Sequence, residues 1–192
     1  MDKGGSVRAL FVDFSKAFDR VNHNVIVSKV IDRGVPHCLI RWLCSYRYLN
    51  ERQQAVRIDG QFSQWLTLAG GMPQGSLIGP LTFILLIDDL RLHCLTHKYV
   101  DDTTLSELLP RRSPDSSMQS YLQDLHVWTT HNKMKINYSK TKEMILGPLA
   151  KSPRDLLSAP SSADLPSGIE RVKHFKLLGI NISRDFGWQN RR

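Results

Sequence analysis

The chain has 192 residues, of which 26 are basic and 18 are acidic, giving a formal net charge of +8 at pH 7. Its hydrophobic fraction of 41% is that of a globular protein and excludes an intrinsically disordered chain. The three cysteines, Cys38, Cys44 and Cys94, show no C-x-x-C spacing, which excludes a disulfide scaffold. The positive charge favours an anionic partner such as nucleic acid.

A membrane location is not expected. Residues 1–5 are polar and carry no apolar stretch of a secretory signal peptide. The longest apolar run, residues 77–87, contains Gly79 and Pro80 and is too short for a bilayer, which requires about 20 residues. We expect an intracellular, reducing compartment, and the sequence does not distinguish nucleus from cytoplasm.

The N-terminal third predicts a strand followed by a helical pair. Residues 7–12 are β-like and end at an aspartate, and residues 15–19 are typical of a turn. Residues 23–33 have the apolar spacing of a helix, with Gly34 as its C-terminal stop. Pro36 can open the second helix.

The next segment predicts a hairpin, a loop and a helix. Residues 54–58 and 65–68 are short strand candidates, with an Asp-Gly turn between them. Residues 70–75 are a glycine-rich loop, and residues 76–95 have the length and composition of a helix.

The C-terminal half repeats the mixture of strands and helices. Residues 99–105 are β-like around two aspartates, and residues 118–133 form an amphipathic helix. Residues 144–146 and 172–182 are strand candidates, and residues 148–168, rich in serine and proline, predict a flexible linker. The whole pattern predicts an α+β fold with helices on one face of a sheet. The linker divides the chain into a core over residues 1–147 and a C-terminal part over residues 169–192.

Two pairs of adjacent aspartates are candidate acidic sites. Asp88 and Asp89 end the apolar helix, where solvated residues near a helix end are the simplest interpretation. Asp101 and Asp102 predict a hairpin tip that displays two carboxylates, with an ordinary surface turn as the alternative. Like charges side by side destabilise the fold unless a cation neutralises them, which favours a divalent metal.

Asp13 strengthens the metal interpretation because it ends a strand and precedes a turn. Three carboxylates from two adjacent strands could hold two Mg²⁺ ions, the arrangement used for in-line phosphoryl displacement. Trp42, Trp65 and Trp128 are expected to be core residues.

Three motifs, taken together, identify a family. The segments FVDFSKAFDRV at residues 11–21, GMPQGSLIGPL at 71–81 and YVDDTTL at 99–105 resemble, in order and spacing, the palm blocks of reverse transcriptases. The nearest resemblance is to non-LTR (LINE-like, Jockey-type) retrotransposon enzymes. It rests on Ala17-Phe18-Asp19, Val21-Asn22-His23, Trp128, Asn132-Lys133, Asn137 and Lys140-Thr141. A group II intron maturase or a retron enzyme is the nearest rival.

The resemblance implies a site for two Mg²⁺ ions, or Mn²⁺ in their place. Its ligands would be Asp13 and Asp101, with Asp102 beside them and the backbone carbonyl of Phe14 as a further oxygen. The nucleotide would be bound by Lys16, Ala17, Phe18, Gln74, Gly75 and Lys140, with Phe18 excluding a 2′-hydroxyl and Lys140 facing the pyrophosphate. A core aromatic at Phe18, a plain turn glycine at Gly75 and a solvated lysine at Lys140 are the alternatives. The segment at residues 174–180 resembles the strand pair that grips the primer end, and Lys176, Leu178 and Gly179 would be its primer-grip residues.

The resemblance also implies a palm-like antiparallel sheet, with the fingers and thumb largely missing and supplied by a longer polyprotein. The expected partners are an RNA template, a DNA primer and deoxynucleoside triphosphates. The first functional hypothesis is RNA-directed DNA polymerase activity, weak or absent in the 192 residues alone. The alternative is an inactive retroelement remnant that binds nucleic acid weakly.

Overall fold

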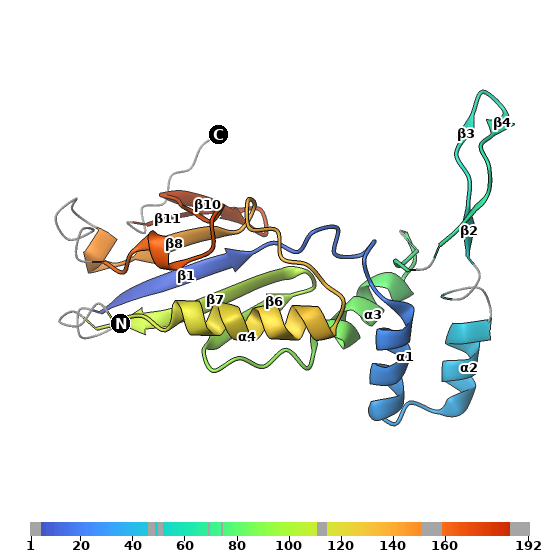
Figure 1. The fold of residues 1–192 in the computed structure, drawn as a ribbon, viewed down its shortest axis with the longest axis horizontal. Helices are drawn as coiled ribbons and strands as arrows, with labels where there is room; N and C mark the ends of the chain where they lie inside the picture. Colours follow the sequence, from blue (N-terminus) through green and yellow to red (C-terminus); the bar gives the residue numbers. More distant parts are fainter. Residues whose placement is uncertain are drawn as a thin grey trace. The chain divides into compact units, whose positions relative to one another are not determined.

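The computed structural model describes residues 5–45, 49, 52–68, 70–73, 75–110, 115–150 and 159–184. The chain divides into two compact units, which are treated one at a time (Figure 1). The first unit comprises Met1–Phe14, Arg91–Trp128 and Ile136–Arg192, and the second comprises Ser15–Leu90 and Thr129–Lys135. Among the described residues, no helix has the length and apolar character to cross a bilayer.

The first unit is built around a five-stranded sheet. Its strand order is β6-β7-β1-β8-β9, and only the β8–β9 pair is parallel. The expected α+β fold is therefore confirmed, and the sheet expected to be antiparallel is so except at β9. The strands are β1 (Ser6–Val12), β6 (Leu95–Tyr99), β7 (Asp102–Leu109), β8 (Lys142–Leu146) and β9 (Glu170–Arg171).

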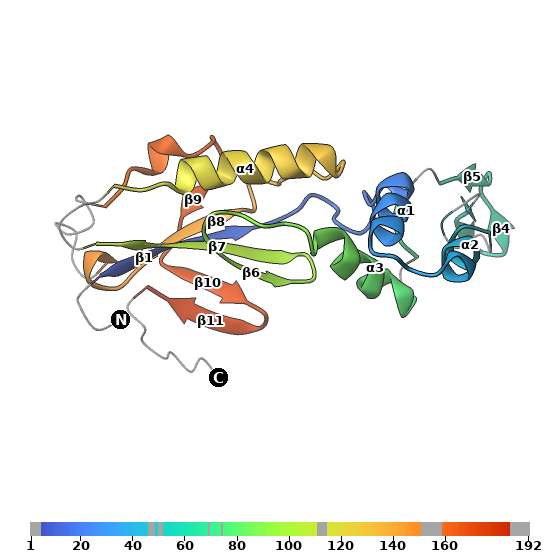
Figure 2. The same cartoon turned by 90° about the horizontal axis from the view of Figure 1, so that it is seen from below.

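Different elements cover the two faces of this sheet. Helix α4 (Met118–His131) lies along one face, and the hairpin of β10 (His174–Leu177) and β11 (Ile180–Ser183) lies on the other (Figure 2). The hairpin is anchored where the ring of Phe175 stacks on Phe11, with centroids 4.1 Å apart. The strand candidate at residues 172–182 is thus two strands, because its Leu-Gly pair forms a turn.

A buried charge network lies inside the first unit. Arg8 is 1% exposed, and its Nε donates to Glu143 Oε1 at 2.6 Å. Arg171 donates to both oxygens of the same carboxylate, at 2.8 and 2.9 Å. Ser162 Oγ also donates to Glu143, at 2.8 Å, and Arg8 Nη1 donates to Ser116 Oγ at 2.6 Å. The network therefore joins β1, β8 and β9 to a segment predicted as linker.

The segment at residues 148–168 has ordered structure where it is described. It contains two short 3-10 helices, η1 (Pro148–Ala150) and η2 (Ser162–Asp164). The carbonyl oxygens of Pro160 and Ser161 accept hydrogen bonds from Arg171 and Arg8. Residues 151–158 lie outside the described residues, so the flexible linker and the domain division based on it stay predictions.

The Glu143 carboxylate is expected to make the fold acid-sensitive. Burial alone would raise the pKa of Glu143, but the hydrogen bonds from Arg171 and the charge of Arg8 outweigh burial and lower the pKa. A lowered pKa stabilises the fold above the ordinary value of 4.5, and this stabilisation is lost as the pH falls below it. In thermal unfolding from pH 7 to pH 3, we expect the stability gap between the unaltered chain and Glu143→Gln to narrow below pH 4.5. A gap of constant size would contradict this role.

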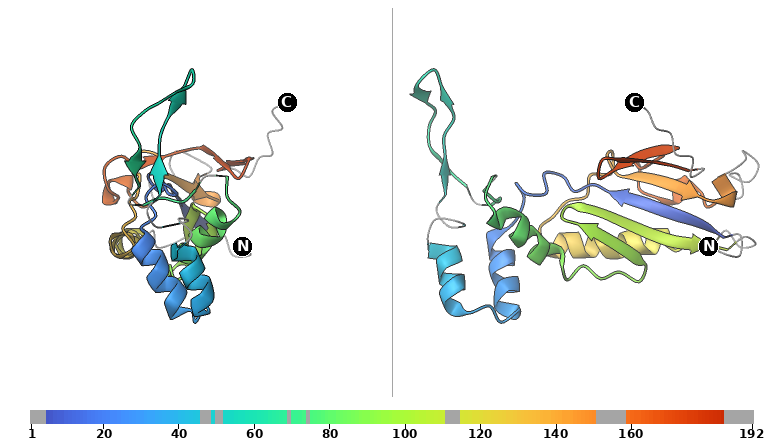
Figure 3. Two further views of the ribbon diagram at one scale, coloured as in Figure 1. Left: turned by 90° about the vertical axis from the view of Figure 1, so that its right-hand side faces the viewer. Right: turned by 180° about the vertical axis from the view of Figure 1, so that it is seen from behind.

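In its described residues, the second unit contains three complete helices and a long hairpin. Its helices are α1 (His23–Asp32), α2 (His37–Ser45) and α3 (Ile78–Ile87). The hairpin pairs β2 (Gln53–Gln54) with β5 (Leu66–Thr67) and β3 (Arg57–Ile58) with β4 (Gln61–Phe62) (Figure 3). Asn22 caps α1 by accepting from the Val25 N–H, and Gly34 follows the helix with φ 68°.

Two expectations for this part of the chain were wrong. The helix predicted over residues 76–95 ends at Ile87, because its last residues instead form the turn into β6, which pairs with β7. Trp42 and Trp65 are 41% and 61% exposed rather than core residues. Trp65 lies in a two-stranded ribbon, where its ring stacks on Phe62 at 6.0 Å instead of packing into a core.

Candidate active site

Three carboxylates lie at one end of the central strand pair. Strand β1 ends at Val12, which is opposite Thr103 of β7. Asp13 follows Val12 directly, and Asp102 precedes Thr103, so the antiparallel register places these two aspartates opposite each other. Asp101 is the adjacent residue, in the turn that leads into β7. The structure therefore brings Asp13 together with the aspartate pair that the sequence singled out.

The turn that carries Asp101 has an unusual backbone. Tyr99 pairs with Asp102, which leaves Val100 and Asp101 as a two-residue turn. Val100 has a φ of 55°, a left-handed conformation that β-branched residues rarely adopt. Strain of this kind persists only where the surrounding structure enforces it, and it occurs often at functional sites. Asp101 and Asp102 therefore follow directly after a residue with a strained backbone.

The carboxylates repel one another. Partial burial raises the pKa of Asp102, and the negative charges of Asp101 and Asp13 raise it further. Within the described part of the chain, no basic side chain forms an ion pair with any of the three. This end of the sheet therefore carries negative charge that a bound cation would neutralise.

The backbone of Asp13 is held by the loop after α4. Its N–H donates to Thr141 Oγ1 at 3.2 Å, and its carbonyl accepts from the Asn137 N–H at 2.8 Å. Thr141 Oγ1 in turn donates to the Asn137 carbonyl at 2.9 Å. The exposed Lys140 belongs to this same loop. The sequence motif containing Asn137 and Thr141 was recognisable, but the positioning of Asp13 by these two residues was missed.

Phe14 offers the backbone oxygen that the resemblance implies. It forms an isolated antiparallel bridge with Ile136. The two hydrogen bonds that frame this bridge use the Asp13 carbonyl and the Ser15 N–H, so the Phe14 carbonyl is not consumed by it.

The donor atoms suit Mg²⁺, although the protein alone does not form a closed cage. Among the described residues, no three His, Cys, Asp or Glu side chains are arranged as a complete metal site. Mg²⁺ in phosphoryl-transfer sites is bound by one or two carboxylates, with waters and substrate phosphates as the other ligands. Asp13, Asp101 and the Phe14 carbonyl would supply only oxygen ligands, which is the ligand type that Mg²⁺ prefers.

Replacing Asp102 with asparagine is expected to stabilise the metal-free chain. The raised pKa of Asp102 means that its ionised form is disfavoured in the folded state, so its charge reduces stability at neutral pH. The side chain is largely exposed, so we expect Tm to rise by only about 1–2 °C. Thermal unfolding at pH 7 with and without Mg²⁺ is the measurement. The difference should shrink when Mg²⁺ is added, and a variant less stable than the unaltered chain without Mg²⁺ would contradict the repulsion.

The residues expected to bind the nucleotide lie mostly in the second unit. Lys16 is exposed with φ 49°, and Ala17 is buried. Phe18 is half-buried, with its ring 4.9 Å from that of Phe83. Gly75 has φ 79° and open space where a Cβ would lie, so its backbone conformation, not crowding, favours glycine there. Gln74 lies outside the described residues.

The hairpin of β10 and β11 carries the expected primer-grip residues. Lys176 is exposed on β10, opposite Asn181. Leu178 and Gly179 form its two-residue turn, with φ angles of 48° and 84°. The strand pair that the resemblance implied is therefore present, and its contact with a primer stays a prediction.

The other aspartate pair has a different environment. Asp88 pairs with Arg33 at 2.7 Å, and Asp89 pairs with Lys29 at 2.5 Å. Lys29 lies in α1 and Arg33 is the residue that follows this helix, so these aspartates attach the C-terminal end of α1 to the end of α3. Their charge is compensated, in contrast to that of Asp13, Asp101 and Asp102.

The comparisons with known proteins agree with the motifs. A family model described as Reverse transcriptase (RNA-dependent DNA polymerase) matches residues 1–182. The "RNA-directed DNA polymerase from mobile element jockey" of Drosophila melanogaster is 31% identical over 185 residues, covering 91% of this chain and 19% of that protein. The "Probable RNA-directed DNA polymerase from transposon BS" of the same species is 32% identical over 146 residues, covering 69% and 16%. The chain therefore spans less than a fifth of the length of either relative.

A solved structure has a similar fold. The structure of apo telomerase from Candida tropicalis, truncated from its C-terminal domain, matches 95% of this chain and 35% of its own, with a TM-score of 0.57. Its sequence identity of 12% supports the fold alone. The family match and the two Drosophila relatives confirm the resemblance to non-LTR retrotransposon enzymes, and the chain belongs to the reverse transcriptase (RNA-dependent DNA polymerase) family.

Proposed function

We propose that this chain carries the nucleotidyl-transfer site of an RNA-directed DNA polymerase and that its first unit is the palm. The observation that supports this most is the convergence of Asp13, Asp101 and Asp102 at one end of β1 and β7 without a basic partner among the described residues. The substrates would be deoxynucleoside triphosphates, with a DNA primer and an RNA template. An intracellular site of action belongs to the same proposal.

The carboxylates would hold two Mg²⁺ ions, or Mn²⁺ in their place. Such ions, when bound, stabilise the attacking and leaving oxygens of an in-line phosphoryl displacement. Asp13 and Asp101 would bind them directly, with the Phe14 carbonyl as a further oxygen ligand. Asp102 would lie beside them: partial burial and the nearby negative charges of Asp101 and Asp13 raise its pKa. The loop that holds the Asp13 backbone through Thr141 would keep the ligand in place.

The other residues would orient the substrates. Lys140, exposed on the loop that holds Asp13, could donate a proton to the leaving pyrophosphate or stabilise its charge. Lys16 and Ala17 would offer backbone N–H groups to the triphosphate, with Gln74 and Gly75 also contacting the nucleotide. The hairpin tip with Lys176, Leu178 and Gly179 would contact the primer end.

Primer extension tests this function. The chain is assayed alone and inside the jockey polymerase, where it replaces the segment that it matches. We expect the hybrid protein to extend a DNA primer on an RNA template when Mg²⁺ and deoxynucleotides are present. Extension that persists after chelation of divalent metal, or a folded hybrid without any extension, would contradict the proposal.

Phe18 is expected to select the sugar of the nucleotide. Its half-buried ring is supported by Phe83, so it can present a fixed surface to the 2′ position of a ribose. Phe18→Ala should raise the use of ribonucleotides relative to deoxynucleotides by about 10-fold or more, because a steric block is removed. The ratio of kcat/KM values in the hybrid protein measures this. An unchanged ratio would favour a purely structural role for the ring.

A further inference from the structure

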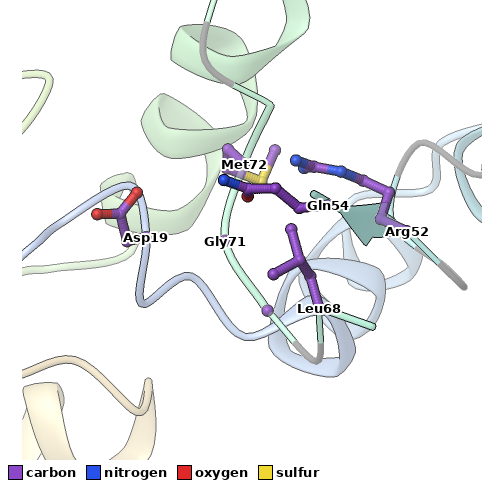
Figure 4. A pocket seen from close by; sticks show the side chains of 7 residues that line it. Asp19, Arg52, Gln54, Leu68, Gly71 and Met72 are labelled. Atoms are coloured by element: carbon purple, nitrogen blue, oxygen red, sulfur yellow. The ribbon is translucent and has the colours of Figure 1, made fainter. Parts of the chain in front are cut away.

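A pocket of about 420 Å³ opens in the second unit beside the loop that contains Gly71. Its lining residues include Asp19, Arg52, Gln54, Leu68, Gly71 and Met72. Figure 4 shows Arg52 and Gln54 extending toward Met72, with Leu68 beneath them and Asp19 on the other side of the Gly71 backbone. A polar group and an apolar surface therefore face the same space.

Arg52, which lines this pocket, has a hydrogen-bond donor without a partner in the part of the chain that the structure describes. Its Nη1 is buried, and none of the described residues accepts a hydrogen bond from it. Buried polar groups are nearly always paired, and a charged donor without a partner destabilises a fold. Because this nitrogen has almost no exposed surface, an acceptor from a ligand would satisfy it when the side chain turns into the pocket.

The backbone beside the pocket is poorly suited to bind a phosphate. Anion-binding loops present successive free N–H groups. Here the Gly71 N–H donates to the Val21 carbonyl at 2.8 Å, and the Met72 N–H donates to the Phe18 carbonyl at 2.9 Å. Both groups are thus occupied in attaching the loop to the segment before α1.

Four of the lining side chains suit a flat ligand with a polar edge. Arg52 offers donors, and the Gln54 amide offers both a donor and an acceptor. Leu68 and Met72 supply an apolar surface. Unpaired nucleobases are bound in this way, by hydrogen bonds to their edges and by contact with their faces.

We propose that this pocket binds one unpaired nucleobase of a single-stranded nucleic acid, with Arg52 and Gln54 at the edge of the base. The inference rests on the proposed function, since a polymerase of this family would have a single-stranded template at hand. It adds a base-binding site within the second unit.

Oligonucleotide binding at several salt concentrations tests the proposal. The probes are a short single-stranded RNA of mixed sequence and an abasic RNA of equal length and charge. Arg52→Met removes the guanidinium but keeps a long apolar side chain. Arg57→Met is the matched control, because it removes an equal charge from the same hairpin, where Arg57 lies over the Phe62 ring.

Arg52→Met should weaken binding of the base-containing RNA by about 10-fold, with the salt dependence unchanged. It should leave binding of the abasic RNA unaltered, whereas Arg57→Met should affect both probes alike. Equal losses on both probes with a salt slope smaller by about 1 would identify a phosphate contact and overturn the proposal. Unchanged binding of both probes would overturn it as well.

Two further controls keep the outcome interpretable. If circular dichroism shows that Arg52→Met does not fold, Gln54→Leu takes its place, with the same expected selectivity for the base-containing probe. If the unaltered chain binds neither probe at low salt, the proposed function fails together with this site. If the unaltered chain binds the two probes equally and no variant changes their relative affinity, only the proposal of a base-binding pocket is contradicted.

Discussion

Replacing Asp101 with asparagine is expected to reduce primer extension by the hybrid polymerase by about 10³-fold or more. Asp101 lies in the turn beside Asp102, which faces Asp13 in the strand register, so the substitution removes one of the charges that would hold the metal ions. The effect should fall on kcat, because the missing interaction is needed in the transition state. Primer extension under single-turnover conditions measures it.

Asp88→Asn is the matched control for this prediction. It removes the same charge from the other aspartate pair, where the carboxylate is exposed and paired with Arg33. Exposed pairs contribute at most about 1 kcal/mol, so the control should extend primers within about twofold of the unaltered protein. If Asp88→Asn were as damaging as Asp101→Asn, the wrong pair would have been assigned.

Replacing Arg8 with methionine should produce the largest loss of stability. Its guanidinium is 1% exposed and hydrogen-bonds to Glu143, which is fully buried. Removing one partner of a buried ion pair leaves an incompletely compensated charge, at a cost of about 3–5 kcal/mol. For a chain of this size, that corresponds to a fall in Tm of roughly 10 °C. Chemical and thermal denaturation at pH 7 measure the loss.

The exposed pair of Lys142 and Glu170 provides the comparison. Its atoms are 3.0 Å apart, but Glu170 is 69% exposed, so Lys142→Met should cost less than about 1 kcal/mol. Adding Glu143→Leu to Arg8→Met should recover part of the loss, because it removes the buried carboxylate. If Arg8→Met and Lys142→Met lowered the free energy of unfolding equally, burial would not be the reason that the Arg8 network stabilises the fold.

Local patterns accounted for most of the elements. The run that became β1, the helix capped by Asn22 and closed by Gly34, and the amphipathic helix α4 all depend on neighbours within a few residues. The turn with Asp101 was also recognisable, because two strand-forming stretches flank it. The sequence could therefore predict that Asp13 lies beside the Asp101-Asp102 turn.

Interactions between residues far apart in the chain could not be predicted from the sequence. The partner of Arg8 lies 135 residues away, and no local signal links the two. The end of α3 depends on the pairing of β6 with β7, and the exposure of Trp65 depends on how the hairpin folds back on itself. These features arise from tertiary contacts that override local propensity.

Iron-directed cleavage tests the location of the metal most directly. Fe²⁺ replaces Mg²⁺ in the folded chain, and radicals produced by ascorbate and peroxide cut the backbone close to the bound ion. The account predicts cuts beside Asp13 and beside Asp101, which are lost in Asp101→Asn and retained in Asp88→Asn. Cuts at Asp88 and Asp89 instead, or a pattern unchanged by Asp101→Asn, would contradict it.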